Sequence, residues 1–330
     1  MYYFCIDFKT KLIMRTKFLM LFLSLSTVVI AQTDSSFIET PVTLETKTGK
    51  IFGTLCTPRN VTSKVPVALL IAGSGPTDRD CNSPKMGLKT DAFKQLAHKL
   101  SGAGIATLRY DKRGIGESKD AMGSELDLRF ENYIDDAKAW VELLKKDRKF
   151  KKVFIIGHSE GSLIGMIAAQ DNVAGYVSLA GAGQRADIIL KQQLSNLPAT
   201  LKDSAMNILD SLAAGKTVNK VPQALYTVFL PAVQPYEISW MKYDPQVEIA
   251  KLKIPVLIIQ GTTDLQVHVD DAVRLSKANV HAKLDTIVGM NHVLKMAPIE
   301  RNANIATYYD PMLPVNGELV KEIETFIESK

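Results

Sequence analysis

The sequence FIIGHSEGSLIG, residues 154–165, decides the fold. It starts as a short apolar run typical of a buried strand and ends as an apolar segment that fits a helix. Between the two, a histidine, a serine and a glutamate stand between glycines, in the pattern G-x-S-x-G. At a strand-to-helix junction this pattern indicates either a plain surface turn or a tight bend that presents a reactive serine.

Strands and helices alternate on both sides of this stretch. Short apolar runs indicate strands, and longer amphipathic segments indicate helices. The predicted strands are residues 40–46, 50–58, 65–73, 105–111, 152–159, 174–182, 254–261 and 282–289. The predicted helices are residues 92–104, 128–147, 160–170, 269–279 and 316–329. This order predicts an α/β fold: a mostly parallel central sheet with helices on both faces, preceded by an antiparallel hairpin.

The alternation stops between residues 184 and 252, where we find no convincing strand. Three segments with helical periodicity are separated there by proline or glycine, at residues 186–197, 201–215 and 221–230. We interpret this helical insertion, late in the sheet, as a cap. The predicted division is a signal peptide at 1–31, core at 32–183, helical cap at 184–252 and core again at 253–330.

The first 31 residues have the pattern of a secretory signal peptide. Basic residues precede an apolar run from Phe18 to Ile30, and Val29 and Ala31 occupy the small-residue positions of a cleavage site. The run is short for a bilayer span. We therefore expect an exported protein, periplasmic or secreted, without a stable membrane span after cleavage. An uncleaved membrane anchor is the alternative.

Charge and cysteine content exclude some classes of function. The net charge is +5, but residues 1–31 contain four of the 40 cations and only one of the 35 anions, so the rest carries about +2. Basic residues form no cluster, which argues against a nucleic-acid partner. For Cys56 and Cys81, a disulfide in an oxidising compartment and two unpaired thiols are equal alternatives. Neither has a histidine at metal-ligand spacing, so we predict no metal site.

Ser159, Asp264 and His292 are the candidate catalytic residues. A serine hydroxyl is a weak nucleophile and needs a base, which an acidic residue in turn orients. Asp264 and His292 each follow a predicted strand, so all three side chains are expected at one edge of the sheet, in the chain order Ser, Asp, His. The nearby alternatives are His268 as the base and Asp270 or Asp271 as the acid.

The backbone N–H groups of Ser74 and Glu160 are the candidate oxyanion hole. Ser74 follows a predicted strand, between glycines that let the backbone approach a substrate closely. Glu160 begins a predicted helix, where N–H groups have no partner within the helix. Because the N–H group has this role, we expect the Glu160 side chain to point toward solvent or the cap. The loop YDKRGIGES, residues 110–118, is interpreted as support beside the site.

These residues together resemble the α/β-hydrolase superfamily over residues 40–326, most of all the exported bacterial serine-aminopeptidase-like hydrolases and esterases. The resemblance implies a Ser159–His292–Asp264 triad, an acyl-enzyme intermediate and no cofactor. The chain departs from many relatives at Ala72-Gly73, where they have His-Gly, but a backbone donor does not need that histidine. The motifs concerned are AGSGP, LRYDKRGIGES, GHSEGS, VQPYEISWMKYDP, VLIIQGTTDLQV and GMNHVLK.

We therefore expect a serine hydrolase that cleaves carboxylic esters of small molecules. Trp240, Met241 and Tyr243 of the cap are candidates to line the substrate pocket. One alternative is an exopeptidase or amidase with the same triad, for which Glu237 is the obvious acidic group in the cap. Another is a ligand-binding protein without activity, although a pure binder has no need of an intact triad.

Overall fold

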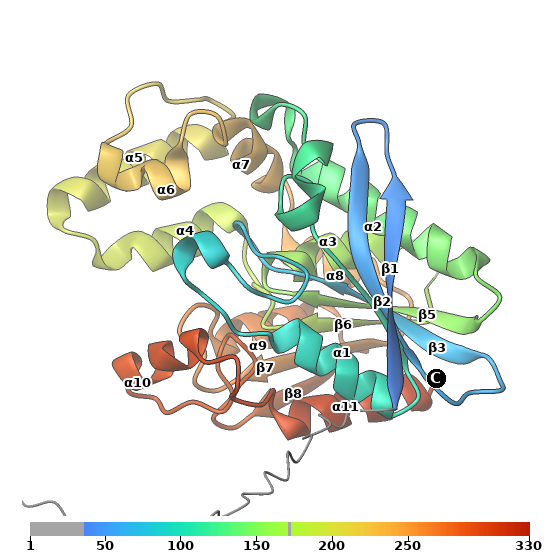
Figure 1. Ribbon diagram of the computed structural model, residues 1–330. Helices are drawn as coiled ribbons and strands as arrows, with labels where there is room; N and C mark the ends of the chain where they lie inside the picture. The colour runs from blue at the N-terminus through green and yellow to red at the C-terminus, as the bar shows by residue number, and fades with distance from the viewer. Residues whose placement is uncertain (1–35, 171–172) are drawn as a thin grey trace, which may run out of the picture. The chain divides into compact units, whose positions relative to one another are not determined.

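The computed structural model describes residues 36–170 and 173–330. The predicted signal peptide, residues 1–31, lies outside this part of the chain. Eight strands form a sheet in the order β1-β2-β4-β3-β5-β6-β7-β8 (Figure 1). Their bounds are β1 Phe37–Glu45, β2 Lys50–Pro58, β3 Val65–Ile71, β4 Ala106–Tyr110, β5 Phe150–His158, β6 Gly175–Leu179, β7 Val256–Gly261 and β8 Lys283–Ile287.

The strand directions follow the sequence pattern. β1 and β2 form an antiparallel hairpin, and β2 also pairs antiparallel with β4. All the remaining neighbours are parallel. β4, β6 and β7 are buried along their whole length, as expected for strands inside a sheet that is covered on both faces. The predicted mostly parallel sheet with an antiparallel hairpin is confirmed.

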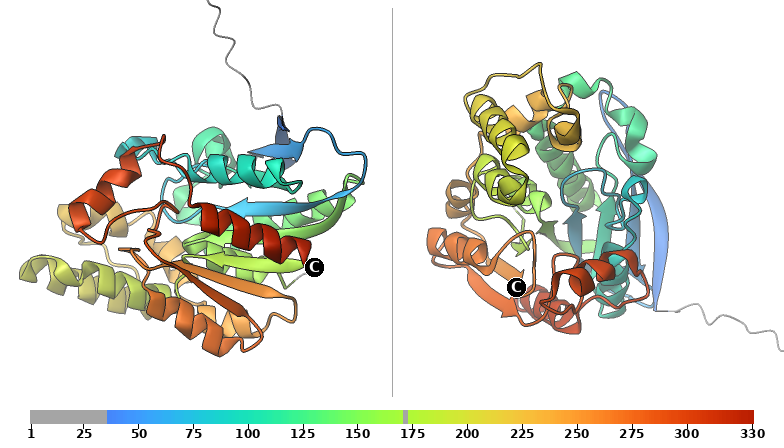
Figure 2. Two further views of the ribbon diagram at one scale, coloured as in Figure 1. Left: turned by 90° about the horizontal axis from the view of Figure 1, so that it is seen from below. Right: turned by 90° about the vertical axis from the view of Figure 1, so that its left-hand side faces the viewer.

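Helices cover both faces of the sheet (Figure 2). One face packs against α1 and α11, and the other against α2, α3, α8 and α9. α2 shows why these segments are helical: Phe130, Tyr133, Ala137, Trp140 and Leu144 recur at helical spacing and are all buried. The bounds are α1 Ala92–Gly102, α2 Phe130–Lys146, α3 Glu160–Ala168, α8 Pro245–Ala250, α9 Val269–Ala278 and α11 Gly317–Glu328.

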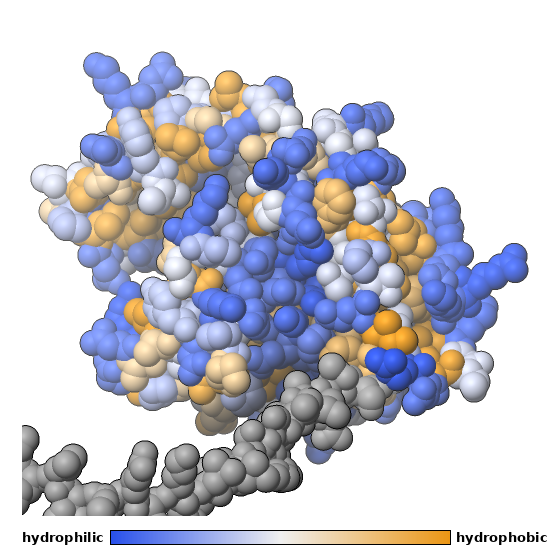
Figure 3. All heavy atoms as spheres, viewed as in Figure 1, coloured by the Kyte–Doolittle hydropathy of each residue, from blue (hydrophilic) through white to orange (hydrophobic). Residues whose placement is uncertain are grey.

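The segment between β6 and β7 is helical. Four of its helices, which we call the cap helices, share a small core of their own that includes Leu209, Phe229 and Met241. α8 also lies in this segment but packs on the sheet through Ile249. On the face shown in Figure 3, hydrophobic residues are frequent around the cap at the upper left. The cap helices are α4 Ala186–Gln193, α5 Ala199–Ala213, α6 Tyr226–Phe229 and α7 Gln234–Trp240.

Over residues 36–170 and 173–330, no helix is both long and apolar enough to cross a membrane.

Short helical turns complete the fold. α10 Arg301–Ala306, which follows the last strand, was not predicted from the sequence. The 3-10 turns are η1 Pro84–Met86, η2 Gly116–Ala121, η3 Glu125–Asp127, η4 Leu194–Asn196, η5 Gln223–Leu225 and η6 Thr307–Tyr309.

Candidate active site

Ser159 stands on the bend between β5 and α3. Its backbone has φ 55° and ψ −121°, a strained conformation that residues with side chains rarely adopt. The flanking glycines make the bend possible. A Cβ at Gly157 would lie 2.2 Å from the carbonyl oxygen of Gly161, and a Cβ at Gly161 would lie 2.3 Å from that of Ile71. The bend thus has the geometry of a nucleophile elbow, not of a plain surface turn.

Asp264 and His292 lie in the loops after β7 and β8. His292 Nδ1 and Asp264 Oδ2 are 2.8 Å apart, and both residues are buried. The N–H groups of Gln266 and Val267 donate to Asp264 Oδ1. Burial would raise the pKa of Asp264, but its interactions with His292 and with these two N–H groups lower it, so the carboxylate stays ionised. A carboxylate that accepts a hydrogen bond from Nδ1–H keeps the single proton of the neutral imidazole on Nδ1. Nε2 is then free to take a proton.

His158 joins the elbow to the His292 loop, a role that the sequence analysis did not give it. Its Nε2 donates to the backbone carbonyl of His292 at 2.8 Å, and the ring centroids are 4.7 Å apart. This contact ties the His292 loop to the residue next to Ser159. In the described residues no hydrogen bond joins Ser159 Oγ to His292 Nε2. Such bonds are often long until a substrate binds.

The alternative base and acids lie elsewhere. His268 is exposed at the start of α9, and Asp270 is exposed in its first turn. Asp271 is buried, and its carboxylate accepts from the N–H of Gly183 at 3.0 Å. Of the acidic residues that the structure describes, Asp264 is the one that hydrogen bonds to His292.

The two candidate oxyanion donors lie beside Ser159. Ser74 is in the loop after β3, Glu160 is the first residue of α3, and all three line one cavity. Within residues 36–170 and 173–330, neither the N–H of Ser74 nor that of Glu160 has a hydrogen-bond acceptor. A Cβ at Gly73 would lie 3.1 Å from Ser159 Cβ, so a glycine there allows the Ser74 loop to approach the serine. Two unpaired N–H groups at this place are suited to bind an oxyanion.

The Glu160 side chain points to the cap and not to solvent. It is buried, and its Oε2 lies 2.7 Å from Lys112 Nζ. Its Oε1 accepts a hydrogen bond from the hydroxyl of Tyr236, in α7, at 2.5 Å. A buried carboxylate needs such partners, because an unpaired charge is costly to bury. The signal in the sequence is the lysine of YDKRGIGES, in the loop predicted to support the site.

A cavity of about 550 Å³ extends from Ser159 between the core and the cap. Much of its wall is apolar, and Trp240 is the predicted pocket residue that lines it. Other lining residues are Leu128, Leu163, Ile189, Val233 and Val267.

Two predicted pocket residues lie away from this wall. Met241 follows Trp240 in the chain but packs into the core of the cap helices. Tyr243 packs on Phe130, with ring centroids 5.5 Å apart, and hydrogen bonds to Glu131 at 3.2 Å. For Met241 the reason is geometric, since consecutive residues at a helix end point in different directions. Tyr243 lies beyond the end of α7. In the described residues, neither side chain lines the cavity.

The family model Hydrolase_4, serine aminopeptidase S33, matches residues 85–296. The chain belongs to this family. The match includes Ser159, Asp264 and His292, whereas Ser74 precedes it.

Curated relatives of this S33 family chain include esterases and lipases. Esterase EstD of Thermotoga maritima is 28% identical over 278 residues, 80% of this chain and 63% of that protein. This chain therefore spans less than two thirds of that relative's length. A monoglyceride lipase homolog of Monkeypox virus is 24% identical over 266 residues, 73% of this chain and 86% of that protein.

Solved structures show the same fold. Est1E of Butyrivibrio proteoclasticus, with ferulic acid bound, has a TM-score of 0.57 at 21% identity, covering 88% of this chain and all of that one. Proline iminopeptidase of Mycobacterium smegmatis also has a TM-score of 0.57, at 13% identity, covering 88% of this chain and 98% of that one. At these identities the likeness concerns the fold and not the substrate.

Glu237 brings a second carboxyl group to the cavity. It belongs to α7, is 6% exposed and lines the wall, and its Oε2 has no hydrogen-bond partner among the described residues. Burial raises its pKa to about 8. At neutral pH it is therefore mostly protonated, and it offers a hydrogen-bond donor more often than a negative charge.

Among the described residues, one group outside the cavity has donors suited to a metal. Ligand atoms of Glu39, Cys56 and His98 lie within 4.8 Å of one another. Arg109 and His98 each lie 2.7 Å from the same Glu39 oxygen, so a guanidinium already neutralises this carboxylate. Cys56 and Cys81 are both free, and the structure thus shows the unpaired alternative.

Proposed function

We propose that this protein is a serine hydrolase that cleaves carboxylic esters. The observation that carries the proposal is the strained backbone of Ser159, on an elbow that lines an apolar cavity and that His158 joins to the loop of His292, which is hydrogen bonded to Asp264. Strained residues of this kind cluster at active sites. The names of the relatives, an esterase and a monoglyceride lipase homolog, support the same reaction class.

In the acylation step, Ser159 Oγ attacks the ester carbonyl carbon while His292 Nε2 takes the hydroxyl proton. The carbonyl oxygen becomes an oxyanion, which accepts hydrogen bonds from the N–H groups of Ser74 and Glu160. The bond to the leaving alcohol then breaks, and His292 gives that alcohol the proton. Asp264 holds the imidazole in the required tautomer and stabilises its cation.

Deacylation repeats these steps with water. His292 Nε2 takes a proton from a water molecule, and the resulting hydroxide attacks the acyl carbon. The oxyanion forms again at the same two N–H groups. The carbon–oxygen bond to Ser159 breaks, the serine recovers its proton from His292, and the carboxylic acid leaves.

Glu237 bears on the alternative of an aminopeptidase. A carboxylate in the cap would bind the ammonium group of a peptide. Its pKa of about 8 means that most molecules carry a neutral acid there at pH 7, which weakens binding of a cation. We favour the ester because two relatives are named as an esterase and a monoglyceride lipase homolog.

The experiment is a panel of p-nitrophenyl esters and aminoacyl p-nitroanilides, with fluorophosphonate labelling. We expect ester hydrolysis, labelling of the wild type and no labelling of Ser159→Ala. That variant should also lose ester hydrolysis by on the order of 10⁶-fold. Turnover of anilides alone would favour the peptidase, and a wild type that neither labels nor hydrolyses would favour a silent binder.

We also infer export, from the signal pattern of residues 1–31. Mass spectrometry of the protein from its native cell envelope should find an N-terminus near Gln32. A full-length product retained in the membrane would favour the uncleaved anchor.

A further inference from the structure

A buried lysine touches the loop that carries the candidate oxyanion donor. Lys112 is 1% exposed, and its Nζ donates to the carbonyl oxygen of Gly73 at 2.7 Å. The same ammonium group lies 2.7 Å from Glu160 Oε2. Lys112 thus contacts the residue before Ser74 and the side chain of the residue after Ser159.

The contact with Gly73 has a consequence for Ser74. The carbonyl of Gly73 and the N–H of Ser74 belong to the same planar peptide unit, and in a trans peptide they point in opposite directions. A carbonyl held against Lys112 therefore directs the Ser74 N–H away from the lysine. If this peptide rotated, the carbonyl oxygen would take the place of the N–H donor. The negative oxyanion would then face the negative end of the peptide dipole.

The contact with Glu160 fixes the other donor. Both carboxylate oxygens are occupied, Oε2 by Lys112 and Oε1 by the hydroxyl of Tyr236. The Lys112 ammonium also lies 4.8 Å from the centre of the Tyr133 ring. A side chain bound at both oxygens restrains its own backbone, and the N–H of Glu160 is part of that backbone.

We propose that the buried Lys112–Glu160 ion pair positions both N–H donors of the oxyanion hole. Lys112 orients the Gly73–Ser74 peptide, and Glu160 anchors the lysine and the start of α3. Neither side chain needs to touch the substrate, so both are positioning residues. This inference rests on the proposed function, since it concerns an oxyanion formed at Ser159.

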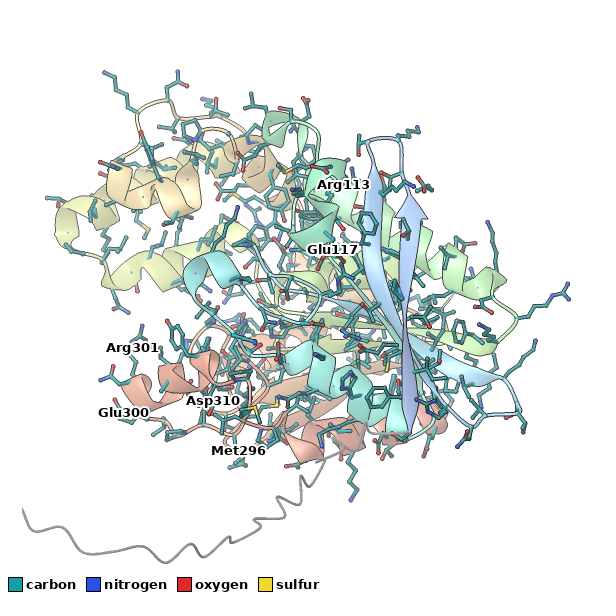
Figure 4. The ribbon with its side chains drawn as sticks, viewed as in Figure 1. Arg113, Glu117, Met296, Glu300, Arg301 and Asp310 are labelled. Atoms are coloured by element: carbon teal, nitrogen blue, oxygen red, sulfur yellow. The ribbon has the colours of Figure 1, made fainter. Side chains whose placement is uncertain are left out.

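A second buried ion pair in the same loop provides a matched control. Arg113, the neighbour of Lys112 and labelled in Figure 4, is paired with Asp136 of α2 at 2.5 Å. Asp136 contacts neither Gly73 nor Glu160 in any hydrogen bond of the described residues. Asp136→Asn and Glu160→Gln both replace a buried carboxylate by an amide opposite a cation, so their structural costs are comparable.

The test compares Lys112→Met, Lys112→Met/Glu160→Gln, Glu160→Gln and Asp136→Asn in the full-length chain. Removing Lys112 should lower kcat for a p-nitrophenyl ester by about 10- to 1000-fold, up to the effect of deleting one oxyanion donor, with KM nearly unchanged. Glu160→Gln should lower kcat less than Lys112→Met does, because the lysine still reaches Gly73. Asp136→Asn should keep its kcat while its melting temperature falls about as far as that of Glu160→Gln.

The double variant shows whether Lys112→Met loses activity because the N–H donors are no longer positioned, or only because a buried charge is left unpaired. It leaves no unpaired buried charge, so it should fold even if Lys112→Met does not. Positioning requires that its kcat stays low and that its crystal structure shows the Gly73–Ser74 peptide rotated. Wild-type kcat, or a low kcat with that peptide unchanged, would overturn the proposal.

A failure of the proposed function can be distinguished from a failure of the positioning proposal. If the wild type hydrolyses no ester and does not label, the enzyme assignment fails. The orientation of the Gly73–Ser74 peptide in crystals of the double variant then decides alone, since a rotated peptide supports the positioning role and an unchanged peptide refutes it.

Discussion

The imidazole of His158 packs against that of His292, with ring centroids 4.7 Å apart, and its Nε2 donates to the His292 backbone carbonyl at 2.8 Å. Burial, reinforced by the nearby His292, lowers the pKa of His158 to about 3. His158 therefore stays neutral at any pH at which the protein is expected to work. Its role is that of a fixed hydrogen-bond donor between the elbow and the His292 loop.

Replacing His158 by phenylalanine keeps a ring at this position and removes the donor. The carbonyl of His292 is then buried without its partner, which costs about 1–3 kcal/mol of stability. We expect a lower kcat because the His292 loop loses an anchor. The pH at which kcat/KM falls on the acid side should not move, because His158 does not titrate there. Urea unfolding and a pH–rate profile measure both effects.

The control is His268→Ala, which removes the exposed histidine at the start of α9. Its kcat should equal that of the wild type. If His268→Ala were inactive while His158→Phe kept full activity, the assignment of the His292 loop would be wrong.

The elbow could be predicted from the sequence because its requirements are local. Two glycines and a serine within five residues, between an apolar strand and an apolar helix, already specify the bend. The ends of the strands could be predicted for the same reason. Because Asp264 and His292 each follow a strand, both were expected at the sheet edge that carries Ser159.

The surroundings of Glu160 could not be predicted in this way. Its partners Lys112 and Tyr236 are 48 and 76 residues away in the chain, and only the fold brings them together. The positions of Met241 and Tyr243 also depend on residues that are distant in the chain. Tyr243, for example, hydrogen bonds to Glu131, 112 residues away. Local periodicity predicts that a segment is helical, but it does not say that the cap helices have a core of their own, which takes up Met241.

Asp264→Asn tests the orientation of the candidate base. An amide that donates to Nδ1 would force the wrong tautomer of His292, so kcat should fall by about 10⁴-fold while the fold is retained. Asp270→Asn, in the exposed first turn of α9, is the control and should keep its activity. Steady-state kinetics and circular dichroism give the two readouts, and the opposite pattern would assign the acid to Asp270.

Glu237→Gln tests the state of the buried acid in the cavity. With a pKa raised by burial from 4.5 to about 8, the folded protein keeps a proton that the unfolded chain has lost throughout this range. The free energy of unfolding of the wild type should therefore decrease as pH rises from 4.5 to 8, by up to about 1.4 kcal/mol per pH unit from this group. Glu237→Gln should lack that part of the slope. Equal slopes for the two proteins in urea unfolding from pH 5 to pH 8 would mean that Glu237 is ionised in the folded state.

Gly161→Ala tests whether the elbow depends on contacts too close for a side chain. The new Cβ would lie 2.3 Å from the carbonyl oxygen of Ile71 and 2.6 Å from that of Ala72, and backbone atoms cannot move aside easily. We expect a loss of about 1–3 kcal/mol or more in stability. The strand and helix would have to separate, which displaces Ser159 from His292, so fluorophosphonate labelling should slow more than stability alone explains.

Gly317→Ala is the matched control for that substitution, since Gly317 also lies in the first turn of a helix. A Cβ at Gly317 meets no atom within 4 Å, and its backbone does not require glycine. This variant should be as active as the wild type and more stable by about 0.4–1 kcal/mol, because alanine restricts the unfolded chain. The comparison separates the effect of a methyl group in a helix from that of a methyl group in the elbow. If Gly161→Ala labelled at the wild-type rate, Ser159 would not depend on the tight approach of α3 to β3, and the elbow would not be the device that presents the nucleophile.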